Sequence, residues 1–293
     1  MSTAASLGSN GVVITVFSTN IFQINLNNRS IIWVMANLCR IPLSKYIFME
    51  PKSNKTIVLE CYRKIIRDLD LSLVDSYVHE DYIQHSPTVK DGRAGLLEML
   101  AFLKTLPKPA VPGPSPIIRV IADGDLVAVH LDIEFMAQHV AVIDLFRLRN
   151  GKIAEHWDAG QPLAPIGDEP ITMTNGRTAI DETADKQVSK TMIRDFYGEL
   201  FRSERDDAVA KFLAHDYVEH NVANGLVNST NGEFKVHRII GEGDFVAAHV
   251  ERLASGQSFA QMHLFRVAGG KVAEHWSVEQ QVPETMAHGN GMF

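Results

Sequence analysis

Two aspartates in one predicted β-hairpin are the residues of this chain best suited to acid–base chemistry. Residues 142–158 place two apolar runs around an Arg-Asn-Gly turn, which is typical of an antiparallel hairpin. Aspartate is depleted in strands because its short carboxylate competes for the backbone, so a pair of them requires a reason. An odd-numbered loop puts four side chains on one face of the hairpin, and an even loop separates them: Asp144, Phe146, His156 and Asp158. We expect the odd loop, which brings the two carboxylates together.

The hairpin pattern occurs twice in the chain. Residues 261–277 repeat it at an offset of 119 residues, with His263 and Ser277 in the positions of the two aspartates. An upstream motif, residues 81–85, recurs at residues 216–220 with an offset of 135. The second copy therefore lacks 16 residues, the difference between these offsets, and they fall where the first copy has a predicted helix and a Pro-rich loop. The chain contains one unit twice, and the second unit is degenerate.

Length, composition and charge limit the classes of function. The chain has 293 residues, enough for two ordinary domains, and its 45% hydrophobic and 22% charged residues are ordinary for a globular protein. A net charge of −7 without a Lys/Arg cluster argues against a nucleic-acid or anionic-membrane surface. The two cysteines, Cys39 and Cys61, provide neither a disulfide framework nor a zinc spacing, and no run of 18 apolar residues is present. We expect a cytoplasmic protein with no nucleic-acid and no membrane partner.

A shift in composition near Glu50 divides the chain. Residues 1–50 contain no acidic residue before Glu50, and no apolar period there matches the later elements. We interpret this segment as a disordered or non-native N-terminal extension, with Met49 as an alternative start. The remaining boundaries are 51–165 for the first unit, 166–186 for a linker, 187–283 for the second unit and 284–293 for a tail.

Each unit has the pattern of helices followed by antiparallel strands. In the first unit apolar residues recur every four positions from Ile57 to Leu69, which predicts an amphipathic helix. A later helix is predicted over residues 93–106, ended by Pro107. Four strands are then predicted, at residues 117–122, 126–133 and 140–148 and in a last strand that ends at Asp158. The predicted fold class is α+β.

This order of elements resembles the cone-shaped α+β barrel of the nuclear transport factor 2 superfamily. Three motifs resemble the SnoaL-like polyketide cyclases within it: residues 82–87, the Asp-Gly-Asp turn, and the hairpin of residues 144–158. The resemblance covers residues 55–165, and 187–283 more loosely. It implies tandem cone-shaped barrels, each with N-terminal helices packed on a curved antiparallel sheet. The chain departs from the family pattern at Ser86, where many relatives carry asparagine, and in the second unit, which lacks the last aspartate and a helix.

The resemblance implies aldol chemistry without a cofactor. An aspartate takes a proton from a carbon activated by neighbouring carbonyls, and the resulting enolate attacks a second carbonyl to close a ring. Asp158, the last aspartate of the hairpin, is the implied general base, because burial against apolar neighbours brings its pKa nearer to the working pH. The alternative, structural role for Asp158 is to cap the turn at the end of its strand. Asp144 either shares a proton with Asp158 or is a buried carboxylate satisfied by the backbone or an arginine.

Histidines and aromatic residues complete the candidate site. His85 and His156 are catalytic candidates as donors to an enolate oxygen, although their recurrence as His220 and His275, in a unit without Asp158, favours a structural role. The substrate-binding candidates, whose aromatic members are ordinarily core residues, are Tyr82, His130, Phe146 and Trp157. No close-spaced pair of ligands supports a metal site, so we expect no metal and no cofactor.

The predicted function is proton abstraction followed by aldol-type cyclisation or isomerisation of a small hydrophobic, polyketide-like carbonyl substrate. A non-catalytic module that binds hydrophobic small molecules is the alternative, and a dimerisation module is a third reading. We expect the outer sheet faces of the two units to pack together as an intramolecular pseudo-dimer, and a further homo-oligomer remains open. Only the first unit is expected to be catalytic, because a serine hydroxyl is no base near neutral pH without an activating group.

Overall fold

The computed structural model describes most of the chain after residue 51 and four strands before it. The described ranges are 52–107, 113–135, 138–163, 172–200, 205–226 and 232–293, with strands at 3–6, 13–18, 21–26 and 29–34. The chain divides into two compact units, Met1–Glu50 and Pro51–Phe293. The second of these contains both copies of the repeat.

The unit Met1–Glu50 contains a four-stranded antiparallel sheet in the order β1-β2-β3-β4. Its strands are β1 (Thr3–Ser6), β2 (Val13–Ser18), β3 (Ile21–Leu26) and β4 (Arg29–Val34). The structure thus assigns strands where the sequence predicted a disordered or non-native extension. That a chain starting at Met49 keeps its melting temperature stays a prediction.

The first copy of the repeat is a five-stranded sheet in the order β5-β9-β8-β7-β6. Its strands are β5 (Val78–Gln84), β6 (Ile117–Asp123), β7 (Leu126–Phe135), β8 (Gln138–Arg149) and β9 (Lys152–Pro162). Neighbouring strands are antiparallel except for β5, which pairs in parallel with β9. The sequence did not predict β5, whose short run of alternating burial follows directly on a helix.

Helical elements precede and interrupt this sheet. They are α1 (Asn54–Cys61), the π-helical η2 (Tyr62–Arg67), the 3₁₀ turn η3 (Leu71–Leu73), α2 (Val74–Tyr77) and α3 (Gly92–Thr105). α1 begins at Ser53, whose hydroxyl accepts the backbone N–H of Thr56, as expected of an N-cap. α3 confirms the helix predicted over residues 93–106. Among the described residues no helix is long and apolar enough to cross a membrane.

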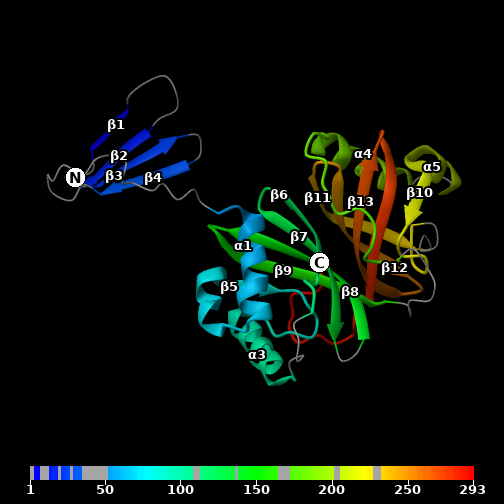
Figure 1. Ribbon diagram of the computed structural model, residues 1–293, viewed down its shortest axis with the longest axis horizontal. Coiled ribbons are helices and arrows are strands. Elements are labelled where there is room, and N and C mark those ends of the chain that lie inside the picture. The colour runs from blue at the N-terminus through cyan, green and yellow to red at the C-terminus, as the bar shows by residue number, and fades with distance from the viewer. Residues whose placement is uncertain are drawn as a thin grey trace. The chain divides into compact units, whose positions relative to one another are not determined.

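The second copy repeats the sheet with fewer helices. Its strands, in the order β10-β14-β13-β12-β11, are β10 (Leu213–Glu219), β11 (Glu233–Glu242), β12 (Phe245–Ala254), β13 (Gln257–Ala268) and β14 (Lys271–Gln281). Two helices precede them, α4 (Lys186–Leu200) and α5 (Arg205–Phe212). The described residues between β10 and β11 contain no helix comparable to α3, as the missing residues predicted. Two sheets with helices on them confirm the predicted α+β class (Figure 1).

Helices cover one face of each sheet and bury an apolar core. In the first copy this cluster joins α1, η2 and α3 to the inward side chains of β7 and β8, including Ile65, Leu100, Val127, Val129 and Leu131. In the second copy it joins α4 and α5 to β12 and β13, including Ile193, Phe196, Val246, Val250 and Phe265. We call these the concave faces of the first and second units.

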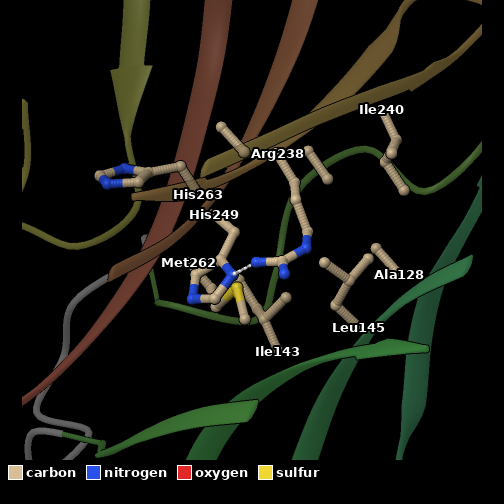
Figure 2. A pocket seen from close by; sticks show the side chains of 10 residues that line it. Ala128, Ile143, Leu145, Arg238, Ile240, His249, Met262 and His263 are labelled. Carbon is tan, nitrogen blue, oxygen red and sulfur yellow. Dashed lines mark hydrogen bonds between the residues drawn. The ribbon is translucent and has the colours of Figure 1, made fainter. Parts of the chain in front are cut away.

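The opposite faces of the two sheets contribute to one shared cluster. Its members come from β6 to β9 and from β11 to β14: Ile121, Ala128, Ile143, Leu145, Trp157, Ile240, Ala247, Met262, Leu264 and Trp276. Two arginines cross it reciprocally. The guanidinium of Arg119 lies 4.0 Å from the ring centre of Trp276, and that of Arg238 lies 3.8 Å from that of Trp157. Figure 2 shows Arg238 among apolar side chains of both sheets, hydrogen-bonded to His249.

The β8–β9 hairpin brings the two aspartates together by a route that the sequence did not predict. Its loop has two residues, an even number: Arg149 pairs with Lys152, and Asn150 and Gly151 have φ angles of 50° and 77°. This is the left-handed geometry of a type I′ turn. The expected odd loop is therefore wrong. The register shifts beyond Arg147, and one residue of β9 is left unpaired as a β-bulge. The bulge changes the parity again, so Asp144 pairs with Asp158.

Candidate functional site

The candidate site lies on the concave face of the first unit, around the facing pair Asp144 and Asp158. Phe146 faces His156 in the next pair along the same hairpin, so all four side chains project from one side of the sheet. Asp144 is 8% exposed, and His156 and Asp158 are partly buried. Two carboxylates and an imidazole in one enclosed place can move protons at pH values where solvated carboxylates are always ionised.

His156 links the end of β5 to the aspartate pair. Its Nδ1–H donates to Oε1 of Gln84 at 3.0 Å, and its Nε2 lies 3.3 Å from Oδ1 of Asp144. The Gln84 oxygen is fixed as an acceptor, because the backbone N–H groups of His85 and Ser86 also donate to it at 3.0 Å. The side-chain amide of Gln84 therefore sets both the tautomer and the orientation of the imidazole.

Tyr62 reaches the same carboxylate from the helices. Its hydroxyl donates a hydrogen bond to Oδ2 of Asp144, and its ring packs edge-on against Phe146 with centroids 5.8 Å apart. Tyr62 begins the π-helical segment η2, in which the N–H of Asp68 bonds to the carbonyl of Arg63 five residues earlier. π-helical turns often occur at functional sites, because they re-aim one side chain without ending the helix.

Asp158 has the strongest properties of a general base. Burial raises its pKa; the nearby His156 charge opposes this shift, and Asp144 adds to it. The Ser86 hydroxyl donates to the carboxylate, while the buried Oδ1 atom has no hydrogen-bond partner among the described residues. An unsatisfied buried carboxylate oxygen is unfavourable for stability and calls for an explanation.

The pKa of His156 is raised, which favours its protonated form. Burial lowers the pKa of His156, but its hydrogen bond to Asp144 and the charges of Asp144 and Asp158 outweigh burial, so the net shift is upward. A protonated His156 beside a carboxylate base makes a donor and an acceptor available in one place. This combination is what general acid–base catalysis requires.

Apolar side chains continue the concave face beyond the aspartates. Val142 pairs with Gly160 on one side and with Leu131 on the other, next to the Asp144–Asp158 pair. Tyr82 is 4% exposed in the same core, and burial, followed by the charges of Asp158 and Asp144, raises its pKa well above the usual value. The surroundings of the carboxylates therefore suit an apolar molecule.

Three predicted site residues lie elsewhere. His85 stacks on Trp157 with ring centroids 4.9 Å apart, and its Nε2 lies 3.0 Å from Glu155. His130 accepts a hydrogen bond from the Arg119 guanidinium at 3.1 Å. Because alternate residues of a strand face opposite ways, His85, His130 and Trp157 lie on the side of the cluster shared by the two sheets. They are not brought together with Asp158. The structure does bring together Asp144, Asp158, His156, Tyr82 and Phe146.

Three residues at the site were not predicted from the sequence. Gln84 and Ser86 alternate with His85 on one extended segment, and the sequence drew attention to the histidine rather than to its neighbours. Tyr62 lies within the amphipathic helix predicted from Ile57 to Leu69, and no role of its own was predicted for it. Its recurrence as Tyr197, at the 135-residue offset of the upstream motif, was the available signal.

The second unit keeps the geometry and exchanges the chemistry. His263 pairs with Ser277 where the first unit has its two aspartates, and Phe265 pairs with His275. Nδ1 of His263 lies 2.9 Å from Nε2 of His275. The Nδ1–H of His275 donates to Glu219, the counterpart of Gln84, at 2.9 Å. A chain of imidazoles ending on a carboxylate replaces the carboxylate pair.

The first site also has the donor set of a small cation site. Asp144, His156 and Asp158 each offer one ligand atom, and these atoms lie within 4.8 Å of one another. Imidazole and carboxylate ligands suit several divalent metals. An experiment on the acid–base mechanism therefore has to distinguish it from a metal-assisted mechanism.

Comparisons with known proteins give matches to part of the chain. Residues 59–156 match the SnoaL-like domain family. Among solved structures, IdmH from Streptomyces antibioticus, named as a candidate polyketide cyclase, is 21% identical, with a TM-score of 0.31, and the match covers 38% of this chain and 93% of that one. A steroid delta-isomerase from Pseudomonas aeruginosa is also 21% identical, with a TM-score of 0.31 and coverage of 38% and 82%. No curated protein matches the chain.

Proposed function

From the SnoaL-like domain at residues 59–156, we infer that the first unit is a cofactor-free enzyme acting on a small hydrophobic carbonyl compound. The observation that carries this inference is the Asp158 carboxylate, which is enclosed, raised in pKa and left with one oxygen unpartnered among the described residues, beside the imidazole of His156. The reaction class is proton abstraction next to a carbonyl, followed by aldol-type cyclisation or isomerisation.

The proton balance assigns a role to each group. The Asp158 carboxylate takes a proton from the carbon next to a carbonyl, and the electron pair of the broken C–H bond moves to the carbonyl oxygen as an enolate. His156 is the group that donates a hydrogen bond to this oxygen, because its contact with Asp144 is long at 3.3 Å and can be exchanged for one with the enolate. For cyclisation, the enolate carbon then bonds to a second carbonyl carbon, and the resulting alkoxide recovers the proton from Asp158.

The substrate class follows from the concave face. On the sheet, the residues next to the aspartate pair include the apolar Leu131 and Val142. Desolvation of an apolar substrate there strengthens the electrostatic contacts to the developing enolate, because water no longer competes for them. A polyketide-like or aromatic dicarbonyl compound fits this environment better than a charged metabolite.

Asp158→Asn is the direct test. The amide has nearly the same shape but cannot accept a proton near neutral pH, so turnover should fall by roughly 100-fold or more. Proton abstraction can be followed by NMR as deuterium incorporation into benzoylacetone above the spontaneous rate. The matched control is His263→Ala in the second unit, which should leave the rate nearly unchanged.

The same assay separates the competing readings. Equal losses from both substitutions would contradict assignment of catalysis to the first unit. An Asp158→Asn variant that binds the diketone as well as the parent protein, when neither exchanges protons, would favour a non-catalytic binding module of the same fold. Loss of exchange on dialysis against a chelator, and recovery with added divalent metal, would contradict the cofactor-free mechanism.

We further propose that the two units act as an intramolecular pseudo-dimer. The shared apolar cluster and the reciprocal pairs Arg119–Trp276 and Arg238–Trp157 support this assignment, because an interface with two-fold symmetry makes every contact twice. In this arrangement the second unit supplies the partner surface that a single domain would obtain from another copy.

A further inference from the structure

The C-terminal segment runs along the loop that follows β5 in the first unit. The N–H of Ala287 donates to the carbonyl of Pro87 at 2.8 Å, and Nε2–H of His288 donates to the carbonyl of Ser86 at 2.9 Å. The side-chain amide of Asn290 donates to the carbonyl of Gln84 at 2.9 Å. Figure 1 shows this red segment beside the green strands of the first sheet. The loop is therefore held by its backbone from outside its own unit.

Two further contacts fix the same loop. Nδ1–H of His85 donates to the carbonyl of Gly291 at 2.9 Å. Asn290 also bonds to the carboxylate of Asp91, which accepts the backbone N–H of Gln84 at 3.0 Å. Burial alone would raise the pKa of Asp91, but these hydrogen bonds lower it, so the carboxylate is ionised and is a strong acceptor.

The far end of the segment is anchored on the second unit. Met292 is 1% exposed, and the ring of Phe293 stacks on His237 and His249, with centroids 4.7 Å and 5.5 Å apart. Both histidines belong to the second sheet. The segment thus forms a bridge between the second unit and the candidate site of the first.

The linker makes the reciprocal contact. The carbonyl of Thr172 accepts Nδ1–H of His220, as the carbonyl of Gly291 accepts that of His85, at 3.0 Å and 2.9 Å. Thr172 and Gly291 are 119 residues apart, which is the offset of the hairpins. The next residues, Met173 and Met292, are both buried. The segment after each sheet therefore crosses to the other unit and binds the equivalent histidine.

We propose that residues 287–292 are a positioning segment for the first site, through which the second unit controls the groups around Asp158. This proposal rests on the proposed function for its kinetic consequence. The segment binds the backbone of Gln84 and Ser86, and the side chains of these two residues bind His156 and Asp158. A displacement of this loop moves the acceptor that orients His156 and the donor that holds Asp158.

Asn290→Ala tests the positioning role. It removes the bonds to Gln84 and Asp91 from an otherwise solvent-facing turn, so the chain should fold. The imidazole of His156 should titrate at a different pH by NMR, because its Gln84 acceptor is no longer held. In the exchange assay kcat should fall about tenfold with little change in KM, since a misplaced group affects chemistry more than binding. Removing residues 287–293 should have the same effects, reversed by a synthetic peptide of residues 284–293.

The matched control is Asn175→Ala in the linker. Oδ1 of Asn175 lies 3.0 Å from Nδ1 of His220, so this substitution loosens the equivalent contact on the second unit. The His156 titration and kcat in the exchange assay should then stay as in the parent protein. The proposal is overturned if Asn290→Ala lowers only the melting temperature, or if Asn175→Ala changes the His156 titration equally. The NMR reading needs no turnover, so it remains decisive if the protein proves not to be an enzyme.

Discussion

The concave faces of the two units have the same backbone and opposite chemistry. In the first unit, the pair beyond the two aspartates is Val142 with Gly160, and it is apolar. In the second unit, the equivalent pair is Gln261 with Glu279, whose side chains are bonded to each other at 2.6 Å. One hairpin geometry thus supports either a polar pair next to apolar residues or a row of polar side chains that bond to one another.

The length of the hydrogen-bonded chain of side chains is the clearest difference between the units. In the second unit, a chain of bonds runs without a break through the following side chains: Arg252, Glu279, Gln261, His263, His275, Glu219 and Tyr217. In the first unit, the chain from Gln84 through His156 ends at Asp144 and Tyr62, and Asp158 keeps a buried oxygen without a partner. The Ser277 hydroxyl of the second unit also lacks a partner among the described residues, but an unpartnered carboxylate oxygen is more unfavourable than an unpartnered hydroxyl, and function explains it in the first unit.

Replacing Glu219, the acceptor of His275, should have the largest effect on stability. In the second unit, Glu219 accepts from His275, from the Tyr217 hydroxyl and from the backbone N–H of Leu226. Glu219→Gln turns an –NH₂ group toward some of these donors and leaves a buried imidazole without its carboxylate acceptor. It should lower the free energy of unfolding by about 3–5 kcal/mol, measured by urea denaturation.

The reverse substitution in the first unit should be mild. The Gln84 oxygen accepts from three donors, and a carboxylate can accept from the same three. Gln84→Glu should therefore change the free energy of unfolding by only about 1 kcal/mol, while raising the pKa of His156 further. If Gln84→Glu lowers the free energy of unfolding as much as Glu219→Gln does, the contrast between the two acceptors is wrong.

Asp144→Asn should move the pH profile rather than abolish activity. The base must be ionised, so activity rises through the raised pKa of Asp158, and the acid must be protonated, so activity falls through the raised pKa of His156. Removing the Asp144 charge lowers both pKa values, and both limbs of the bell should shift about one unit to lower pH. His263→Asn, at the equivalent position, should leave the bell unchanged, and a bell that does not move on Asp144→Asn would refute the coupling.

Ser277→Ala should have the smallest effect. The Ser277 hydroxyl is buried without a hydrogen-bond partner among the described residues, so its removal forfeits no bond. The free energy of unfolding should stay the same or rise by about 1 kcal/mol in thermal denaturation, and proton exchange should not change. A loss of exchange would mean that the second unit takes part in the reaction and that the contrast between the units is wrong.

Local patterns in the sequence determined the elements and their duplication. Apolar residues at every fourth position predicted the helix that begins at Asn54, and the Arg-Asn-Gly turn between apolar runs predicted the β8–β9 hairpin. The offsets of 119 and 135 residues predicted a second unit without a counterpart of the helix at residues 93–106, and the described residues agree. Such signals are readable because each depends on neighbours along the chain.

Tertiary structure alone decided which residues meet. The β-bulge on β9, rather than the loop length, places Asp144 opposite Asp158, and a bulge leaves little trace in a sequence. The parallel pairing of β5 with β9 sends Gln84 and Ser86 to the site while His85 packs against Trp157, a choice of face that one residue of register would reverse. The contact between residues 287–292 and the first unit spans about 200 positions of the chain. No local period encodes such a contact, because it is stabilised only after both units have folded.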